Sequence, residues 1–193
     1  MVSIICTARS GATNLSLYLK KVFNINFISS PFLNNEKKID SLKENNLYKH
    51  MIHSLPNGYY DLYEFGKDVI KLSDIVILYD RKDKIKQSES LAFKKFKYQN
   101  DYSKYHIREL YDNIDTDLFE ECLFYFNKQS EVIKKLSEEF NIPIFWYEDL
   151  YYDNGLELLS KYINKKIDKE AKIKFLSKDN KQRVDNIKKG DLI

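Results

Sequence analysis

Residues 2–13 read Val2-Ser3-Ile4-Ile5-Cys6-Thr7-Ala8-Arg9-Ser10-Gly11-Ala12-Thr13, and they carry the strongest fold signal in the chain. The β-branched run from Val2 to Cys6 is typical of a strand, and the apolar pattern from Asn14 onward is typical of a helix. Between them, Ser10 and Gly11 favour a tight turn. A strand, a tight loop and a helix in this order form the first unit of a parallel α/β fold.

The same alternation of strands and helices continues along the chain. Its clearest strand is Asp74–Tyr79, whose continuous apolar run predicts burial on both faces. We therefore expect a three-layer P-loop-like α/β fold, with a central parallel sheet, right-handed crossovers and flanking helices. The expected strands are Val2–Cys6, Asn26–Ser29, Leu47–His53, Asp74–Tyr79 and Ile142–Tyr147. The expected helices begin near Asn14, Glu36, Tyr59, Asp83, Thr116 and Asp153.

Composition limits the class of protein. A chain of 193 residues with 43% hydrophobic content can bury one sizeable core, so we expect a single domain over residues 1–193. Its interspersed charges sum to only +3, which does not favour nucleic acid as a partner. Cys6 and Cys122 are expected to be buried free thiols, without a disulfide or a metal site. We expect a cytoplasmic protein, because no apolar run approaches the roughly 20 residues of a membrane span. The oligomeric state is left open.

The loop Thr7–Thr13 is expected to bind a phosphate-like anion. Backbone N–H groups and the dipole of the following helix converge on such a loop. An ATP-binding P-loop would read Gly-x-x-x-x-Gly-Lys-[Ser/Thr], but Cys6 stands at the first glycine and Ala12 at the lysine. The cation of this loop is Arg9 instead, which argues against a nucleoside triphosphatase.

This loop resembles the first loop of the sulfotransferases that use 3′-phosphoadenosine 5′-phosphosulfate (PAPS), roughly [Lys/Arg]-Ser-Gly-[Thr/Ser]-[Thr/Ser]-x-Leu. Here it reads Arg9-Ser10-Gly11-Ala12-Thr13-Asn14-Leu15, with an alanine at one hydroxyl position. The arginine form, preceded by Cys-Thr, is most similar to bacterial carbohydrate sulfotransferases of the trehalose-sulfating type. The resemblance implies that Arg9 stabilises the bridging oxygen as it leaves. It implies a binding site for the 5′-phosphosulfate made of Thr7, Arg9, Ser10, Gly11, Ala12, Thr13 and Asn14.

A second basic motif follows the strand Asp74–Tyr79. It reads Arg81-Lys82-Asp83-Lys84-Ile85-Lys86-Gln87-Ser88-Glu89-Ser90 and resembles Arg-Arg-Asp-Lys-x-x-Gln-Ala-x-Ser of the same bacterial family. A basic pair at a strand's C-terminal end and a hydroxyl about two helical turns later can converge on one phosphate. In open α/β sheets ligands bind at these strand ends, so we expect Arg81, Lys82 and Ser90 to bind a phosphate. The resemblance implies that this is the 3′-phosphate of the nucleotide.

Two further segments resemble the family more weakly. Tyr147-Glu148-Asp149-Leu150, after the last expected strand, is similar to a Tyr-Glu-Asp-Leu stretch common in sulfotransferases. We expect Glu148 and Asp149 to cap or orient a helix, because carboxylates are favourable at a helix N-terminus. Late in the chain, Lys181-Gln182-Arg183 resembles a Lys-Gln stretch near the family's C-terminus.

The expected catalytic groups are cations and one base. The resemblance implies a lysine on the strand between the two motifs, here Lys49, as a second cation for the transition state. A histidine or carboxylate would take the proton of the acceptor hydroxyl. His53 and His50 follow Lys49 much as in the Lys-x-His of the animal cytosolic sulfotransferases. Glu36 lies where the bacterial carbohydrate enzymes carry Pro-x-Glu, and the sequence does not choose among these three.

The expected function is therefore sulfuryl transfer from PAPS to a hydroxyl acceptor by in-line displacement. The acceptor would be a hydroxyl-bearing small molecule or glycan, and 3′-phosphoadenosine 5′-phosphate (PAP) would leave as the product. By analogy with phosphoryl transfer, positioning and cations should dominate, so no metal is expected. Two alternatives remain, namely an inactive nucleotide-binding module of the same fold and a divergent P-loop kinase.

Overall fold

The computed structural model describes residues 1–29, 31, 39, 42–52, 61–99, 116–152 and 154–167, with the backbone alone described at 93–99 and 151–152. The chain divides into two compact units. The first comprises Met1–Lys82 with Phe126–Ile167, and the second comprises Asp83–Tyr125 with Asp168–Ile193. A single domain over the whole chain stays a prediction.

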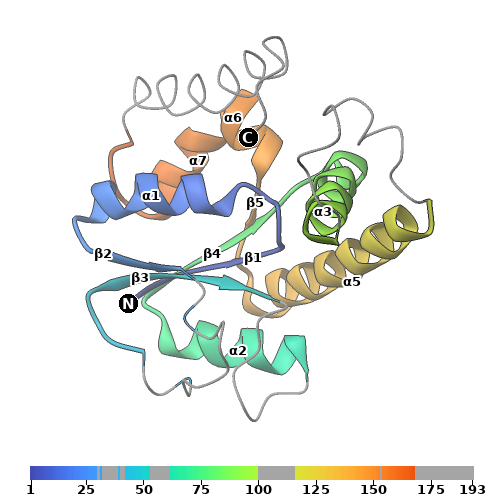
Figure 1. Cartoon of the computed structure of the whole chain (residues 1–193). Coiled ribbons are helices and arrows are strands. Elements are labelled where there is room, and N and C mark those ends of the chain that lie inside the picture. Colours follow the sequence, from blue (N-terminus) through green and yellow to red (C-terminus); the bar gives the residue numbers. More distant parts are fainter. Residues whose placement is uncertain are drawn as a thin grey trace. The chain divides into compact units, whose positions relative to one another are not determined.

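A parallel five-stranded sheet forms the centre of the first unit (Figure 1). Its strands are β1 (Val2–Cys6), β2 (Asn26–Ser29), β3 (Asn46–Met51), β4 (Ile75–Asp80) and β5 (Ile144–Trp146). They lie in the order β2-β3-β1-β4-β5, which confirms the predicted α/β class with an all-parallel sheet. Cys6 pairs with Met51 and Tyr79, and Asp80 pairs with Trp146. The ends of β3, β1, β4 and β5 therefore reach the same edge of the sheet.

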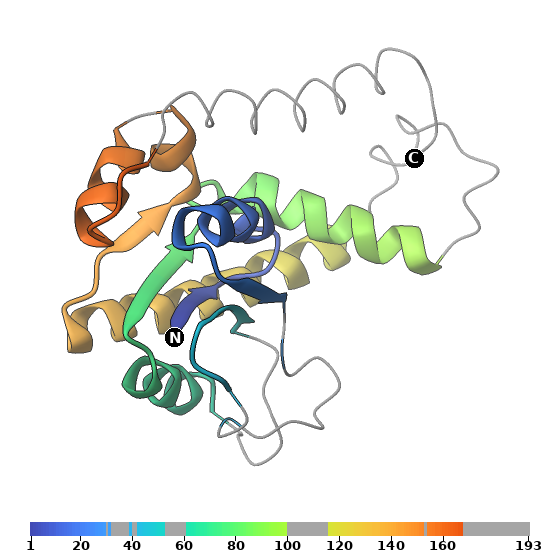
Figure 2. The same ribbon diagram turned by 90° about the vertical axis from the view of Figure 1, so that its left-hand side faces the viewer.

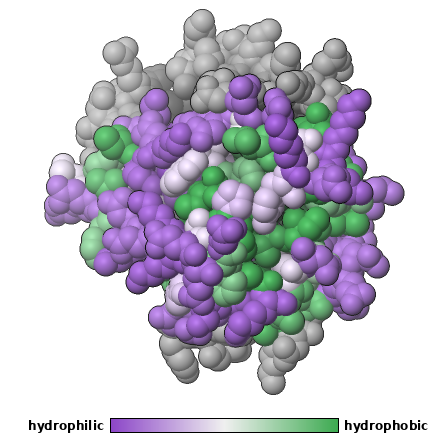
Figure 3. All heavy atoms as spheres, turned by 180° about the vertical axis from the view of Figure 1, so that it is seen from behind, coloured by the Kyte–Doolittle hydropathy of each residue, from purple (hydrophilic) through white to green (hydrophobic). Residues whose placement is uncertain are grey.

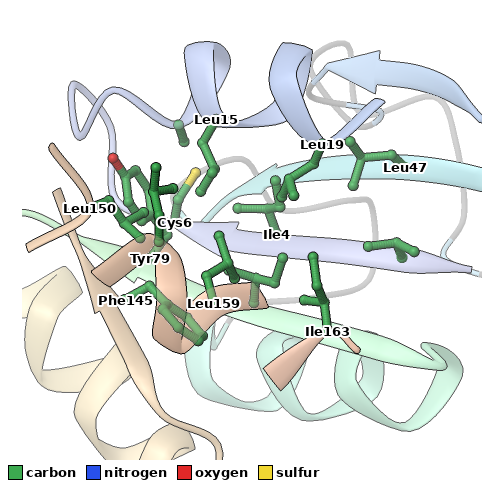
Figure 4. Close-up of a cluster of buried hydrophobic side chains, with 14 of the residues drawn as sticks. Ile4, Cys6, Leu15, Leu19, Leu47, Tyr79, Phe145, Leu150, Leu159 and Ile163 are labelled. Carbon is green, nitrogen blue, oxygen red and sulfur yellow. The ribbon is translucent and has the colours of Figure 1, made fainter. Parts of the chain in front are cut away.

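Helices cover both faces of this sheet (Figure 1). One face carries α1 (Ala12–Phe23), α6 (Tyr147–Tyr152) and α7 (Gly155–Tyr162). The other carries α2 (Leu62–Leu72) and the later part of α5 (Thr116–Phe140). Because side chains alternate along a strand, Ile4 packs into the first core and Ile5 into the second. Figure 4 shows the first core, with Ile4 among side chains from α1 and α7.

The second unit contains α3 (Lys84–Gln99) and the first part of α5. Asp83 caps α3, since its Oδ1 accepts a hydrogen bond of 2.9 Å from the backbone N–H of Lys86. The predicted helices near Asp83 and Thr116 are thus confirmed. No helix among the described residues is long and apolar enough to cross a membrane.

The expectation for residues 142–147 was wrong at both ends. The expected strand Ile142–Tyr147 is only Ile144–Trp146 long, and Tyr147 begins α6. Asn141 adopts a left-handed conformation (φ 52°), and the N–H of Ile142 donates a hydrogen bond to the carbonyl oxygen of Ser137. These two residues therefore terminate α5 and do not belong to the strand. Strand pairing therefore starts only after Pro143.

The strand expected at Leu47–His53 is shorter as well, because β3 ends at Met51 and residue 52 forms a turn. The helix expected near Glu36–Glu44 lies mostly outside the described residues. At its described end, residues 42–45 form coil and a turn rather than a helix. Residues 100–115 and 168–193, including Lys181-Gln182-Arg183, lie outside the described residues.

Strand β5 forms one edge of the sheet, as the view in Figure 2 shows. A shallow pocket of about 190 Å³ lies between β5, α6 and α7. It is lined mainly by apolar side chains, including Ile144, Trp146, Leu158 and Tyr162. Figure 3, seen from behind, shows apolar surface gathered on this side of the molecule and bordered by hydrophilic side chains.

Candidate functional site

The two segments predicted to bind anions lie side by side. The loop after β1 and Arg81 after β4 leave adjacent strands at the same edge of the sheet. The ring of Tyr147 contacts both of them. A Cβ atom placed on Gly11 would lie 2.9 Å from Cδ2 of Tyr147, and the guanidinium carbon of Arg81 lies 5.0 Å from the centre of the same ring. One ligand could therefore reach both segments.

The backbone of the first loop is held in an uncommon conformation. Gly11 has φ +84° and Arg9 has φ +56°, and the second value is costly for a residue with a side chain. Gly11 is also the N-cap of α1, and no described side chain caps this helix. The first-turn N–H groups, at Ala12 and Thr13, therefore face the loop with the positive end of the helix dipole. Arg9 is exposed beside them.

The hydroxyl groups of the loop have two different roles. Thr7 and Ser10 are buried, and Ser10 Oγ donates a 2.8 Å hydrogen bond to the carbonyl oxygen of Thr7. These two side chains hold the loop in shape. Thr13 is exposed, and its Oγ1 accepts a 2.9 Å hydrogen bond from Nζ of Lys49. The structure thus brings together Lys49 on β3 and Thr13 at the start of α1, as a shared site requires.

Lys49 carries a buried cation next to the loop. Its residue is only 7% exposed, and this burial lowers the pKa of its ammonium group. Nearby Cys6 is fully enclosed, and burial raises the pKa of its thiol to about 12. Cys6 is therefore a neutral packing residue at physiological pH rather than a nucleophile.

Beneath the loop lies a buried carboxylate that the sequence analysis did not single out. Asp80, 0% exposed, accepts hydrogen bonds from Thr7 Oγ1 (2.7 Å), the backbone N–H of Arg81 (2.7 Å) and Ser130 Oγ (2.6 Å). Gln129, beside Ser130 on α5, accepts a 3.4 Å hydrogen bond from the N–H of Ala8. The signal in the sequence was a carboxylate at the end of an apolar strand, where burial requires partners. This network joins the loop after β1 to β4 and α5.

The cations Arg81 and Lys82 are paired with carboxylates of α6. Glu148 Oε1 lies 3.7 Å from Nε of Arg81, and Glu148 Oε2 accepts a 2.9 Å hydrogen bond from the backbone N–H of Lys82. Nζ of Lys82 lies 2.5 Å from Asp149 Oδ1. Glu148 and Asp149 lie in the first turn of a helix, as carboxylates at a helix N-terminus should, but no pattern in the sequence indicated their cation partners. Ser90 lies on α3, in the second unit.

Of the three candidate bases, the structure describes only His50. It lies on the opposite face of β3 from Lys49, is 1% exposed, and packs against Tyr48 and Phe65 at ring-centre distances of 5.9 and 6.0 Å. Burial lowers the pKa of His50 to about 3, so the ring is neutral at pH 7. This is the environment of a core side chain. Glu36 and His53 lie outside the described residues.

The buried His50 predicts a loss of stability in mild acid. Its pKa is lower in the folded chain (about 3) than in the unfolded chain (6.5), so below pH 6.5 only the unfolded state takes up this proton. Between pH 7 and pH 5 the imidazole should therefore lower the free energy of unfolding by about 2 kcal/mol. Urea denaturation at both pH values measures this loss, and a His50→Gln variant should lose about 2 kcal/mol less than the wild type. Equal losses in the two proteins would refute this assignment.

The described residues include no group of three or more His, Cys, Asp or Glu side chains placed to hold a metal ion. The candidate site instead has a cationic part at the loop after β1 and a part beside α6 whose net formal charge is zero. The ammonium group of Lys49 and the N-terminus of α1 place positive charge at the loop, and Arg9 is exposed beside them. The formal charges of Arg81, Lys82, Glu148 and Asp149 sum to zero. Such a site suits an elongated anionic ligand whose main charge lies on the loop. No protein-family model matches this chain, and a search of curated proteins finds no significant match.

Proposed function

We propose that this chain is a sulfotransferase that moves a sulfuryl group from PAPS to a hydroxyl acceptor. The resemblance of its two motifs to bacterial carbohydrate sulfotransferases suggests a carbohydrate as the acceptor and a P-loop-like fold. One observation carries the proposal. The loop with Arg9 and the segment with Arg81 follow neighbouring parallel strands and contact one tyrosine ring, so a single nucleotide can span them.

Lys49 supports the choice of a group-transfer reaction over simple binding. The ammonium group of Lys49 donates a hydrogen bond to Thr13 at the loop, and within the described part of the chain no carboxylate forms an ion pair with it, so its positive charge is available to a ligand. Fixed cations in a site of low dielectric stabilise charge that develops in a transition state better than mobile surface lysines do. Arg9, which is exposed at the mouth of the loop, can add a second positive charge.

In the proposed step, the acceptor oxygen attacks the sulfur atom of PAPS. A new oxygen–sulfur bond forms while the bond between sulfur and the bridging phosphate oxygen breaks, and PAP leaves with the electron pair. The acceptor's proton passes to a base, for which Glu36 and His53 remain the candidates. Lys49 and Arg9 stabilise the negative charge that grows on the bridging oxygen. The products are the sulfate ester, PAP and one proton.

Binding and turnover test the proposal together. The melting temperature of the purified chain should rise with PAP at concentrations well above its dissociation constant, because a ligand of the folded state stabilises it. Incubation with PAPS labelled in the sulfuryl group and a panel of sugars and phenols should then give a labelled sulfate ester.

The other outcomes point to the alternatives. Stabilisation by PAP without any product over the whole panel would favour the inactive nucleotide-binding module. Stabilisation by ATP with Mg²⁺ but not by PAP would contradict the proposal and select the P-loop kinase.

A further inference from the structure

The cations assigned to the 3′-phosphate are already in contact with carboxylates. Asp80 and Trp146 are paired across β4 and β5, so the residues that follow them leave the sheet next to each other. This register brings Arg81 and Lys82 against the first turn of α6. Two positive and two negative side chains thus form one cluster, and their formal charges sum to zero.

Each cation has a defined partner. The guanidinium group of Arg81 lies against Glu148 at 3.7 Å and over the ring of Tyr147, and its side chain is only 19% exposed. Lys82 binds Glu148 through its backbone N–H and Asp149 through its ammonium group. Glu148 therefore contacts both basic residues: it accepts a hydrogen bond from the backbone N–H of Lys82, and it lies at ion-pair distance from Nε of Arg81, which has no hydrogen-bond partner among the described residues.

A phosphate group brings nearly two negative charges and needs the same N–H donors. It cannot bind beside Glu148 and Asp149 without strong repulsion, because like charges brought together at a partly buried site are unfavourable. A phosphate must therefore displace the two carboxylates from Arg81 and Lys82. An unphosphorylated ribose hydroxyl would make no such demand.

We propose that Glu148 and Asp149 are specificity-determining residues that weaken the preference of this site for a 3′-phosphorylated nucleotide. The proposal rests on the proposed function, since it concerns the same nucleotide site. In the free protein the two carboxylates are paired with Arg81 and Lys82, and a 3′-phosphate binds by taking the place of the carboxylates. The exchange releases the first turn of α6, including Tyr147, which also packs on the loop at Gly11.

The selectivity is measured with two commercially available nucleotides that differ only in the 3′-phosphate, PAP and AMP. Their dissociation constants are determined by calorimetry for the wild type, for Glu148→Gln, for Asp149→Asn and for the double variant. The ratio Kd(AMP)/Kd(PAP) should rise about tenfold in the double variant, because the competing charges are gone and the amides keep the shape. Arg81→Ala should lower the ratio.

The matched control is Glu157→Gln, which removes an exposed carboxylate paired with Lys161 on α7. This variant should leave the ratio unchanged.

A second measurement uses the unmodified chain. Its single tryptophan, Trp146, immediately precedes α6 and is half-buried. PAP should shift or quench the Trp146 emission as the carboxylates leave their partners, whereas AMP should cause at most a small change. The two nucleotides share the adenine, so AMP controls for direct quenching by the base.

The outcomes separate this proposal from the proposed function. If both nucleotides bind but the ratio is the same in the wild type and the double variant, the selectivity proposal is overturned and the nucleotide site stands. An equal emission change with PAP and AMP would overturn it as well. If no variant binds either nucleotide, both the selectivity proposal and the proposed function fail.

Discussion

In the proposed sulfuryl transfer, the Lys49→Met variant is expected to react about 10²- to 10³-fold more slowly than the wild-type chain, as when one oxyanion donor is removed from an enzyme. Methionine keeps most of the apolar stem that is packed in the sheet and removes only the ammonium group. The loss should appear in kcat at saturating PAPS, because the charge on the leaving oxygen develops in the transition state and not in the bound substrate.

The dependence of the rate on pH distinguishes this role from a structural one. A lysine is cationic below its pKa, and burial lowers the pKa of Lys49 from the ordinary 10.5. As pH rises through the lowered value, the wild type should lose its cation and its rate, whereas Lys49→Met should lack this alkaline limb. Lys20→Met, an exposed lysine on α1, is the control and should transfer sulfate at the wild-type rate. A Lys49→Met rate close to that control would rule out the proposed role.

The sequence predicted the central sheet well because its strands have a strong local signal. The runs Val2–Cys6 and Asp74–Tyr79 are short, apolar and rich in β-branched residues, which suits strands buried on both faces. The loop after β1 could be predicted for the same reason, since the strand and helix around it fix its place. Helix α6 was missed because six residues are too few to show a helical period.

The partners of the predicted cations could not be read from the sequence. Glu148 lies 66 positions after Lys82, and the two meet only because β5 pairs with β4 at the edge of the sheet. Strand order follows from the packing of the whole chain and leaves no local pattern. The same holds for Asp80 and Ser130, which come from different elements 50 positions apart. The sequence therefore predicted where charge would gather but not how much of it would be neutralised.

The buried hydrogen bonds of Asp80 should contribute strongly to the free energy of unfolding. Its carboxylate satisfies a hydroxyl of the loop, a backbone N–H and a hydroxyl of α5, and none of its surface is exposed. In Asp80→Ala these three donors lose their acceptor inside the protein. Each buried donor left unsatisfied costs about 1–3 kcal/mol, although the two hydroxyls can rotate toward other acceptors. We therefore expect the free energy of unfolding to fall by about 3–5 kcal/mol.

Asp61→Ala provides the matched comparison for this prediction. The side chain of Asp61 also accepts from backbone N–H groups, those of Tyr63 and Glu64, but it caps α2 at the surface. Its removal should cost only about 1 kcal/mol, because water can replace the lost acceptor. Urea denaturation followed by circular dichroism gives both values. Thr7→Val and Ser130→Ala, which each remove one hydroxyl donor from the network, should fall between the two. If Asp80→Ala costs no more than Asp61→Ala, the buried network does not stabilise the folded chain beyond what an exposed helix cap contributes.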